Sequence, residues 1–99
     1  MAHYALARFE LRADQAAELA LHDHASYVRR ELPGVMWTAY RDPDAPARYT
    51  ALVRIEDAKA EAQERAAFAA ALGPFLVGEV ETTVLELVTS SDLQRRHRR

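Results

Sequence analysis

Polar and apolar side chains alternate along the first segment of the chain. Residues 3–11 place a mainly apolar set on one side and a more polar set on the other, with the period of two that is typical of a β-strand. Asp14 then stands where a helix cap belongs, and apolar residues recur at helical spacing from Ala17 to Leu32, until Pro33-Gly34 ends the run. A strand followed by a helix is therefore expected over residues 3–32.

The rest of the chain shows the same kinds of strand and helix pattern in a different order. Residues 35–56 are rich in β-branched and aromatic residues on both sides of the turn sequence DPDAPA, which predicts a β-hairpin. From the cap Asp57, the segment AKAEAQERAAFAAAL favours a helix that ends at Gly73-Pro74, and residues 77–88 read as a last strand. The order β-α-β-β-α-β predicts an α+β ferredoxin-like sandwich, a four-stranded antiparallel sheet with both helices on one face.

The other face of this sheet is predicted to be apolar. The residues assigned to it are Leu6, Leu52, Val80, Val84 and Val88, a patch large enough to need a partner surface. A chain of 99 residues also buries only about two-thirds of the surface that its unfolded form exposes. We therefore expect a homodimer that packs sheet on sheet.

Arg54 brings a charge onto the same face, because it alternates with Val53 and Ile55. A charge in such an interface is costly unless it is paired. We expect Arg54 to bond a carboxylate, Glu10 or Glu86, in its own chain or across the dimer.

Composition narrows the possible functions. The chain has no cysteine, which excludes disulfides and thiolate chemistry. Four of its 13 basic residues lie in the final RRHRR, so the remainder is acidic, which argues against a nucleic-acid-binding domain. No run of eighteen apolar residues and no signal-like start are present, so we expect no membrane span and a cytoplasmic protein. One domain is expected over residues 1–90, and residues 91–99 form a basic tail that is either frayed or in electrostatic contact with a partner.

His24 is the candidate for acid–base chemistry. It falls on the apolar face of the first predicted helix with Leu21 and Val28. It is either a partly buried histidine bonded to a carbonyl or the acid or base of a pocket. His22 and His24 are two residues apart on a helix and point in different directions, so no shared metal site is expected.

Aromatic side chains could line a cavity between the helices and the sheet. They either pack the core or suit a flat aromatic or quinone-like ligand. The residues expected to line this pocket are Trp37, Tyr40, Tyr49, Ile55 and Phe68.

Over residues 3–88 the sequence resembles the antibiotic biosynthesis monooxygenase family, whose members are dimeric α/β-barrel proteins. The likeness lies in the PG turn before an aromatic strand, the DP turn, a strand that ends in ED, an alanine-rich helix with Phe68, and the closing TTVLEL. The resemblance implies a sheet-to-sheet dimer and a monooxygenase that acts on a small aromatic or quinone-like compound without metal or flavin.

The family's own site residues are replaced in this chain. The asparagine and tryptophan of the oxygenases align with Ala51 and Ile55, and the set used by haem-degrading members aligns with Ala7, Ile55 and Leu72. None of these side chains can ligate iron or donate the missing hydrogen bonds, so no cofactor is expected. His24 remains as the candidate base. The alternatives are a non-catalytic dimer that binds a small apolar ligand and a stress-type dimeric barrel of unknown ligand.

Overall fold

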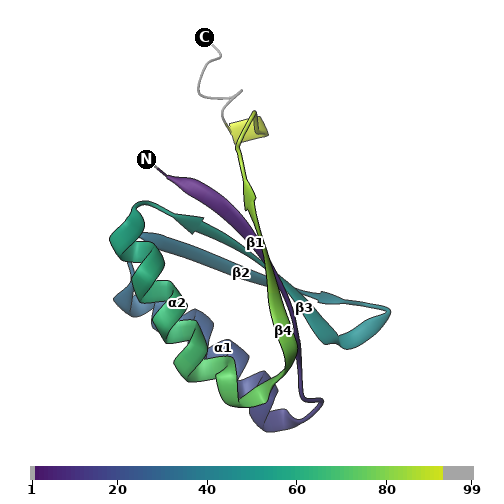
Figure 1. The fold of residues 1–99 in the computed structure, drawn as a ribbon. Helices are drawn as coiled ribbons and strands as arrows, with labels where there is room; N and C mark the ends of the chain where they lie inside the picture. Colours follow the sequence, from purple (N-terminus) through teal and green to yellow (C-terminus); the bar gives the residue numbers. More distant parts are fainter. Residues whose placement is uncertain (1, 93–99) are drawn as a thin grey trace.

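Two helices and four strands follow one another in the predicted order (Figure 1). The structure, a computed structural model, describes residues 2–92. The strands are β1 (His3–Leu11), β2 (Val35–Asp42), β3 (Ala45–Ile55) and β4 (Leu76–Leu85), and the helices are α1 (Gln15–Glu31) and α2 (Ala58–Leu72). The bounds of β1 agree with the prediction, whereas β4 ends three residues earlier than expected.

Both helices begin at the predicted caps. The side chain of Asp14 accepts a hydrogen bond of 2.8 Å from the backbone N–H of Ala17, and that of Asp57 accepts one of 2.8 Å from Ala60. Each carboxylate satisfies a backbone donor that the first turn of a helix leaves unpaired. These two caps confirm where α1 and α2 start.

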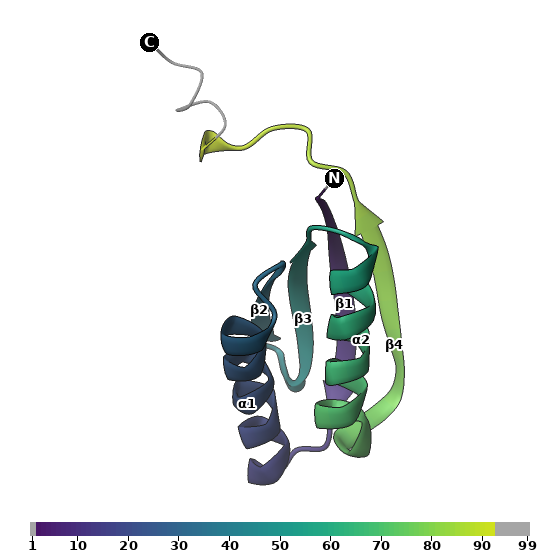
Figure 2. The same ribbon diagram turned by 90° about the vertical axis from the view of Figure 1, so that its left-hand side faces the viewer.

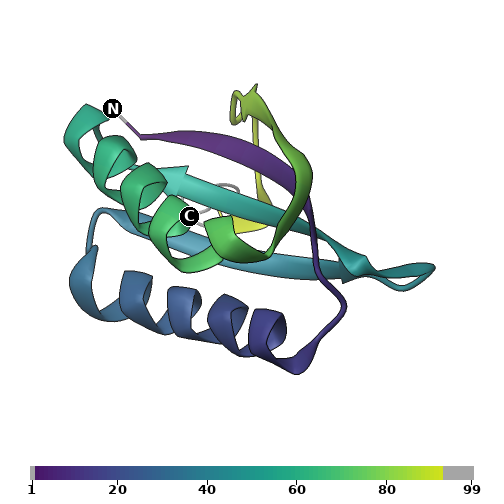
Figure 3. The ribbon, with the colours of Figure 1, turned by 60° about the horizontal axis from the view of Figure 1, so that its bottom comes forward.

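The strands form one antiparallel sheet in the order β2-β3-β1-β4. Both helices lie side by side on one face of the sheet (Figures 2 and 3). The predicted ferredoxin-like α+β architecture is therefore confirmed. Among residues 2–92, no helix is long and apolar enough to cross a membrane.

The core lies between the helices and the sheet. The strand residues that face the helices are buried, including Phe9 on β1 and Ala51, Val53 and Ile55 on β3. Leu72 near the end of α2 is fully covered. The register that buries these residues sends their neighbours in the strands to the opposite face of the sheet.

The face turned away from the helices, called the open face below, is partly as predicted. Leu6 and Leu52 are register partners there and are half-buried. Val84 was assigned to the wrong face, because it pairs with Ala5, a residue on the helix side of β1. Val80 is also wrong, since it packs against the core. Val88 follows the end of β4.

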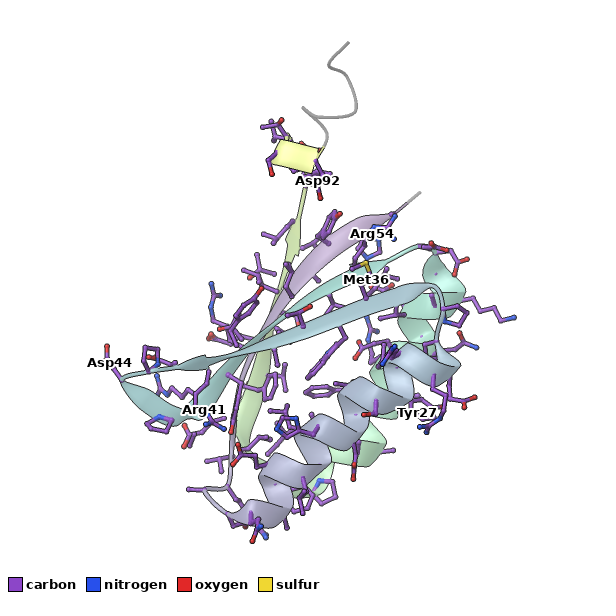
Figure 4. All side chains as sticks on the ribbon, turned by 180° about the vertical axis from the view of Figure 1, so that it is seen from behind. Tyr27, Met36, Arg41, Asp44, Arg54 and Asp92 are labelled. Atoms are coloured by element: carbon purple, nitrogen blue, oxygen red, sulfur yellow. The ribbon has the colours of Figure 1, made fainter. Side chains whose placement is uncertain are left out.

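Arg54 lies on the open face, as predicted, with Tyr4 and Met36 as its register partners (Figure 4). Its nearest carboxylate within the chain is not one of the two proposed. Arg54 Nη1 lies 3.7 Å from Glu56 Oε1, while Glu10 lies 3.6 Å from Arg48 Nε at the other end of the β1–β3 ladder. An intrachain bond to Glu10 is therefore wrong, because about six residues of strand separate the two side chains. A bond across a dimer stays a prediction.

The C-terminal end of the chain carries two further predicted features, Glu86 and the basic tail. Glu86 is exposed and follows the end of β4. The RRHRR segment lies outside the described residues.

Candidate functional site

His24 is the polar side chain of the core. It lies in the middle of α1, between Leu21 and Val28, and only 1% of its surface is exposed. Among residues 2–92 it is the one polar or charged residue that is buried. The predicted position of His24 on the apolar face of the helix is confirmed.

Glu64 on α2 is the partner of His24. Nε2 of His24 lies 3.3 Å from Oε2 of Glu64, whose side chain is only 13% exposed. Glu64 is not among the residues predicted above from the sequence. The signal was its spacing, because Glu64 is four residues after the buried Ala60 and four before Phe68, and so lies on the face of α2 that packs inward.

The two ring nitrogens of His24 differ in their surroundings. Nδ1 is buried and has no hydrogen-bond partner among the described residues. A carboxylate accepts hydrogen bonds and does not donate them, so the hydrogen of the neutral ring belongs on Nε2, facing Glu64. Nδ1 then carries a lone pair and is the free acceptor. The geometry thus provides a buried imidazole with one nitrogen against a carboxylate and the other turned to no acceptor or donor among the described residues.

The aromatic residues form a connected layer around this base. Trp37 and Phe68 meet the His24 ring at nearly right angles, with ring centroids 4.8 Å and 5.6 Å away. Phe68 continues to Phe9 at 5.2 Å, and Phe9 to Tyr49 at 5.8 Å. Three of the predicted pocket residues, Trp37, Tyr49 and Phe68, are therefore brought together, and Phe9 joins them although sequence analysis did not select it.

Two of the predicted pocket residues lie differently. Tyr40 does not belong to this layer, because it pairs with Thr50 on the open face and is 58% exposed. It is three residues from Trp37, and an odd spacing in a strand places two side chains on opposite faces. Ile55 does face the helices and is 3% exposed, and its register partners are His3 and Val35.

Tyr49 ends the aromatic layer near the start of α1. Its hydroxyl accepts a hydrogen bond of 3.3 Å from Arg41, which also donates one of 2.6 Å to Glu18. The hydrogen bond and the charge of Arg41 lower the pKa of the Glu18 carboxyl, and Glu18 and Tyr49 together raise the pKa of Arg41. The phenol of Tyr49 is thus engaged with Arg41, which ties the β2–β3 hairpin to α1.

A groove between the two helices leads toward His24. It has a volume of about 490 Å³ and lies between α1 and α2. Tyr27 projects from α1 at this groove (Figure 4). Its lining residues are Asp23, His24, Tyr27 and Arg30 on α1 and Ala67, Ala70 and Ala71 on α2. The groove thus differs in place from the predicted cavity, which was expected between the helices and the sheet. There the rings of Trp37 and Phe68 pack against His24.

A second hollow lies at the open face. It has a volume of about 360 Å³, and charged side chains of both signs surround it, among them Arg8, Arg48, Glu79 and Glu81. The surface on which dimerisation was predicted is therefore charged at this end and apolar around Leu52.

The core offers no ligands for a metal or for haem iron at the family positions. Ala51 and Leu72 are fully buried and Ile55 nearly so, and all three have hydrocarbon side chains. Within the described part of the chain, no three histidine, cysteine or carboxylate residues come together in a way that could hold a metal ion. The polar group that this part of the core does offer is the His24 imidazole, in an aromatic environment.

Solved structures with this arrangement of strands and helices are numerous. A protein of Caulobacter crescentus CB15 named for the antibiotic biosynthesis monooxygenases superimposes with a TM-score of 0.72, at 22% identity over 89% of this chain and 91% of that one. The chain has the fold of the antibiotic biosynthesis monooxygenases. Rv0793 of Mycobacterium tuberculosis gives a TM-score of 0.71, at 21% identity over 92% and 99% of the two chains. SnoaB of Streptomyces nogalater, a cofactor-independent oxygenase, gives 0.71, at 20% identity over 90% and 95%. No protein-family model and no curated protein matches the chain.

Proposed function

We propose that the protein is a cofactor-independent monooxygenase of a small aromatic or quinone-like compound, with His24 as its general base. The observation that carries the proposal is the buried imidazole, which lies against Glu64 at one nitrogen and has no partner among residues 2–92 at the other. A buried acceptor of this kind costs free energy unless something bonds to it. The fold shared with SnoaB, a cofactor-independent oxygenase, supports the same reaction class.

The reaction begins with proton transfer from the ligand. An aromatic hydroxyl donates to Nδ1 of His24, the proton moves to that nitrogen, and the imidazolium then donates to the ligand anion on one side and to Glu64 on the other. The carboxylate balances the new positive charge inside the protein. Trp37 and Phe68 pack against the flat rings of the ligand and keep water away from the anion.

Dioxygen then oxidises this anion. At a ring methylene conjugated with the phenolate, dioxygen takes four electrons as the CH₂ group becomes a carbonyl. One oxygen atom enters the product, and the other leaves as water with the two hydrogens of the methylene. The substrate supplies every electron, so the reaction needs no flavin and no metal.

The groove between the helices is the proposed entrance. The His24 side chain is fully covered, so a ligand reaches Nδ1 when α2 moves away from α1. The α2 side of the groove consists of Ala67, Ala70 and Ala71, whose small side chains bury little apolar surface. Local opening at this seam is therefore less costly than opening elsewhere in the core.

The working unit in this proposal is a homodimer joined through the open face. Leu6 and Leu52 are half-buried in one chain, while Met36 is 63% exposed on the same face. A stable interface buries about 1,000 Å² or more in total. The open face of a four-stranded sheet is large enough to provide it.

A thermal-shift screen followed by an oxygen electrode tests the proposal. Polyketide-like phenols, quinones, flavins and haem are screened, since a ligand that binds the folded state raises the unfolding midpoint. We expect a phenol to bind and to consume oxygen with the wild-type protein, and the His24→Gln variant to lose oxygen consumption. His22→Gln is the matched control, because His22 is an exposed histidine on the same helix. Equal turnover in the two variants would contradict the role of His24.

A non-catalytic dimer that binds a small apolar ligand is the second candidate. The observation in its favour is the apolar character of Ala51 and Ile55, which face the helices where the oxygenases are expected to carry polar and aromatic groups. The same screen separates the two functions. Binding without oxygen consumption at any phenol would favour the second.

A further inference from the structure

Glu64 differs from Glu61, the other carboxylate of α2, in where its charge is placed. Glu61, one turn earlier, lies 3.6 Å from both Arg65 and His3, and its side chain is 37% exposed. Glu64 is 13% exposed and lies 3.3 Å from the fully covered ring of His24. A carboxylate in this position is costly unless its partner donates a hydrogen to it.

The contact decides which nitrogen of the neutral ring carries the hydrogen. With the hydrogen on Nε2, the ring donates to Glu64 and Nδ1 is an unprotonated acceptor. With the hydrogen on Nδ1, the lone pair of Nε2 would face the oxygen of Glu64 at 3.3 Å, and a buried N–H would have no acceptor among the described residues. The second arrangement therefore carries two penalties and the first carries none of that kind.

We propose that Glu64 is a positioning residue that fixes the hydrogen of His24 on Nε2, and that the site consequently selects ligands which bring a hydrogen-bond donor to Nδ1. This inference rests on the proposed function for its second half only. The ligand class is a flat aromatic compound with a free hydroxyl, bound as the protonated phenol. An aryl methyl ether of the same shape has no hydrogen to donate, so it leaves Nδ1 unpaired in the complex.

The first half can be tested without any ligand, by ¹⁵N NMR of the histidine rings. In the neutral His24 ring of the wild type we expect the hydrogen on Nε2, shielded from exchange with solvent, and a lone-pair signal from Nδ1. Glu64→Ala removes the acceptor, so the Nε2 hydrogen should lose its protection and a second tautomer should appear. Glu64→Gln keeps an acceptor oxygen of similar reach and should retain the wild-type pattern.

Two controls separate positioning from a general effect on the fold. Glu61→Ala deletes a half-buried carboxylate that does not contact His24 from the same helix, and it should leave the His24 signals unchanged. Backbone ¹H–¹⁵N spectra report whether each variant is folded, and Glu64→Gln provides a conservative variant should Glu64→Ala unfold. A wild-type ring with its hydrogen on Nδ1, or an unchanged, still protected Nε2 hydrogen in folded Glu64→Ala, would overturn the role of Glu64.

The ligand class is tested with 1-naphthol and its methyl ether, 1-methoxynaphthalene. We expect the wild type to bind the naphthol at least about tenfold more tightly than the ether, since one lost buried hydrogen bond accounts for a factor of that order. Fluorescence of Trp37, the single tryptophan, reports binding beside His24. His24→Phe keeps a ring but has no nitrogen, so its preference for the naphthol should disappear. Equal affinities in the wild type would overturn the ligand class, whereas binding of neither compound would contradict the proposed function and leave the NMR result to decide the role of Glu64.

Discussion

Shortening one leucine on the open face should weaken the proposed dimer while leaving the fold of the single chain intact. Leu52 lies in the middle of β3, where Leu6 on β1 and Thr38 on β2 are its register partners. It is half-buried in the single chain, and its side chain points away from the helices. The Leu52→Ala variant therefore removes contacts mainly from the partner surface rather than from the core.

The magnitude follows from the burial of hydrocarbon. Leu→Ala removes three carbon atoms, each worth about 0.8 kcal/mol when buried. Most of the Leu52 side chain is already covered in the single chain, so about 1 kcal/mol of dimerisation free energy is lost per copy. A two-fold interface contains the residue twice, which gives about 2 kcal/mol for the dimer. Since 1.4 kcal/mol corresponds to a factor of ten, the dissociation constant should rise roughly 25-fold.

Sedimentation across a concentration series measures this shift. Leu19→Ala is the matched control, because Leu19 is 57% exposed on α1, on the side of the molecule away from the open face. We expect Leu19→Ala to sediment like the wild type, and the dissociation constant of Leu52→Ala to rise roughly 25-fold with an unchanged circular dichroism spectrum. A dissociation constant that moves less than about threefold, or a monomeric wild type, would refute the assignment of the open face as the interface.

Three further predictions concern charges and haem. Arg54→Ala should weaken dimerisation about tenfold or more, as measured by the same sedimentation series, while the unfolding of the single chain changes little, because the exposed pair with Glu56 contributes little within one chain. Glu18→Gln should lower the free energy of unfolding at neutral pH but not in acid, because the hydrogen bond from Arg41 lowers the pKa of the Glu18 carboxyl in the folded protein. The stabilisation by Glu18 is therefore present above the ordinary carboxyl pKa of 4.5 and is lost as the pH falls through the lowered pKa of the folded state, and urea unfolding at neutral and at acid pH measures this difference. Hemin added to the protein should give no sharp Soret band of histidine ligation, and a band lost on replacing any one histidine would show that the aligned positions were wrongly placed.

The order of the elements and most of their bounds, those of β4 excepted, could be predicted because each signal is local. The alternation in residues 3–11, the caps Asp14 and Asp57, and the Gly73-Pro74 stop act within one or two turns of the chain, and each lies in the structure where it was expected. Which residues of β4 face the helices could not be predicted from the strand's own sequence. Its apolar residues occur at both odd and even positions, and only the pairing with β1 places Val84 on the same face as Ala5.

The candidate site could be predicted in part for the same reason. The burial of His24 could be predicted from its position on the apolar face of α1, but its partner Glu64 lies forty residues later in the chain, on the other helix. Only the crossing of the two helices brings Glu64 to Nε2, although its place between Ala60 and Phe68 was a usable hint. Tyr40 was misplaced because composition was considered without the alternation that separates it from Trp37.

The cost of the His24–Glu64 pair is itself an argument about function. Hydrocarbon side chains of similar volume would fill the same space without a carboxylate to desolvate and without an unpaired nitrogen, and such replacements are often neutral or stabilising. A single chain of 99 residues has a thin core and gains little by placing a polar pair there. The fold can sustain this arrangement when stability comes from elsewhere, and the half-buried leucines of the open face are where a second chain would supply it. In the proposed dimer, burial of the open face would thus compensate the free energy that the His24–Glu64 pair costs, which would couple the interface to the site.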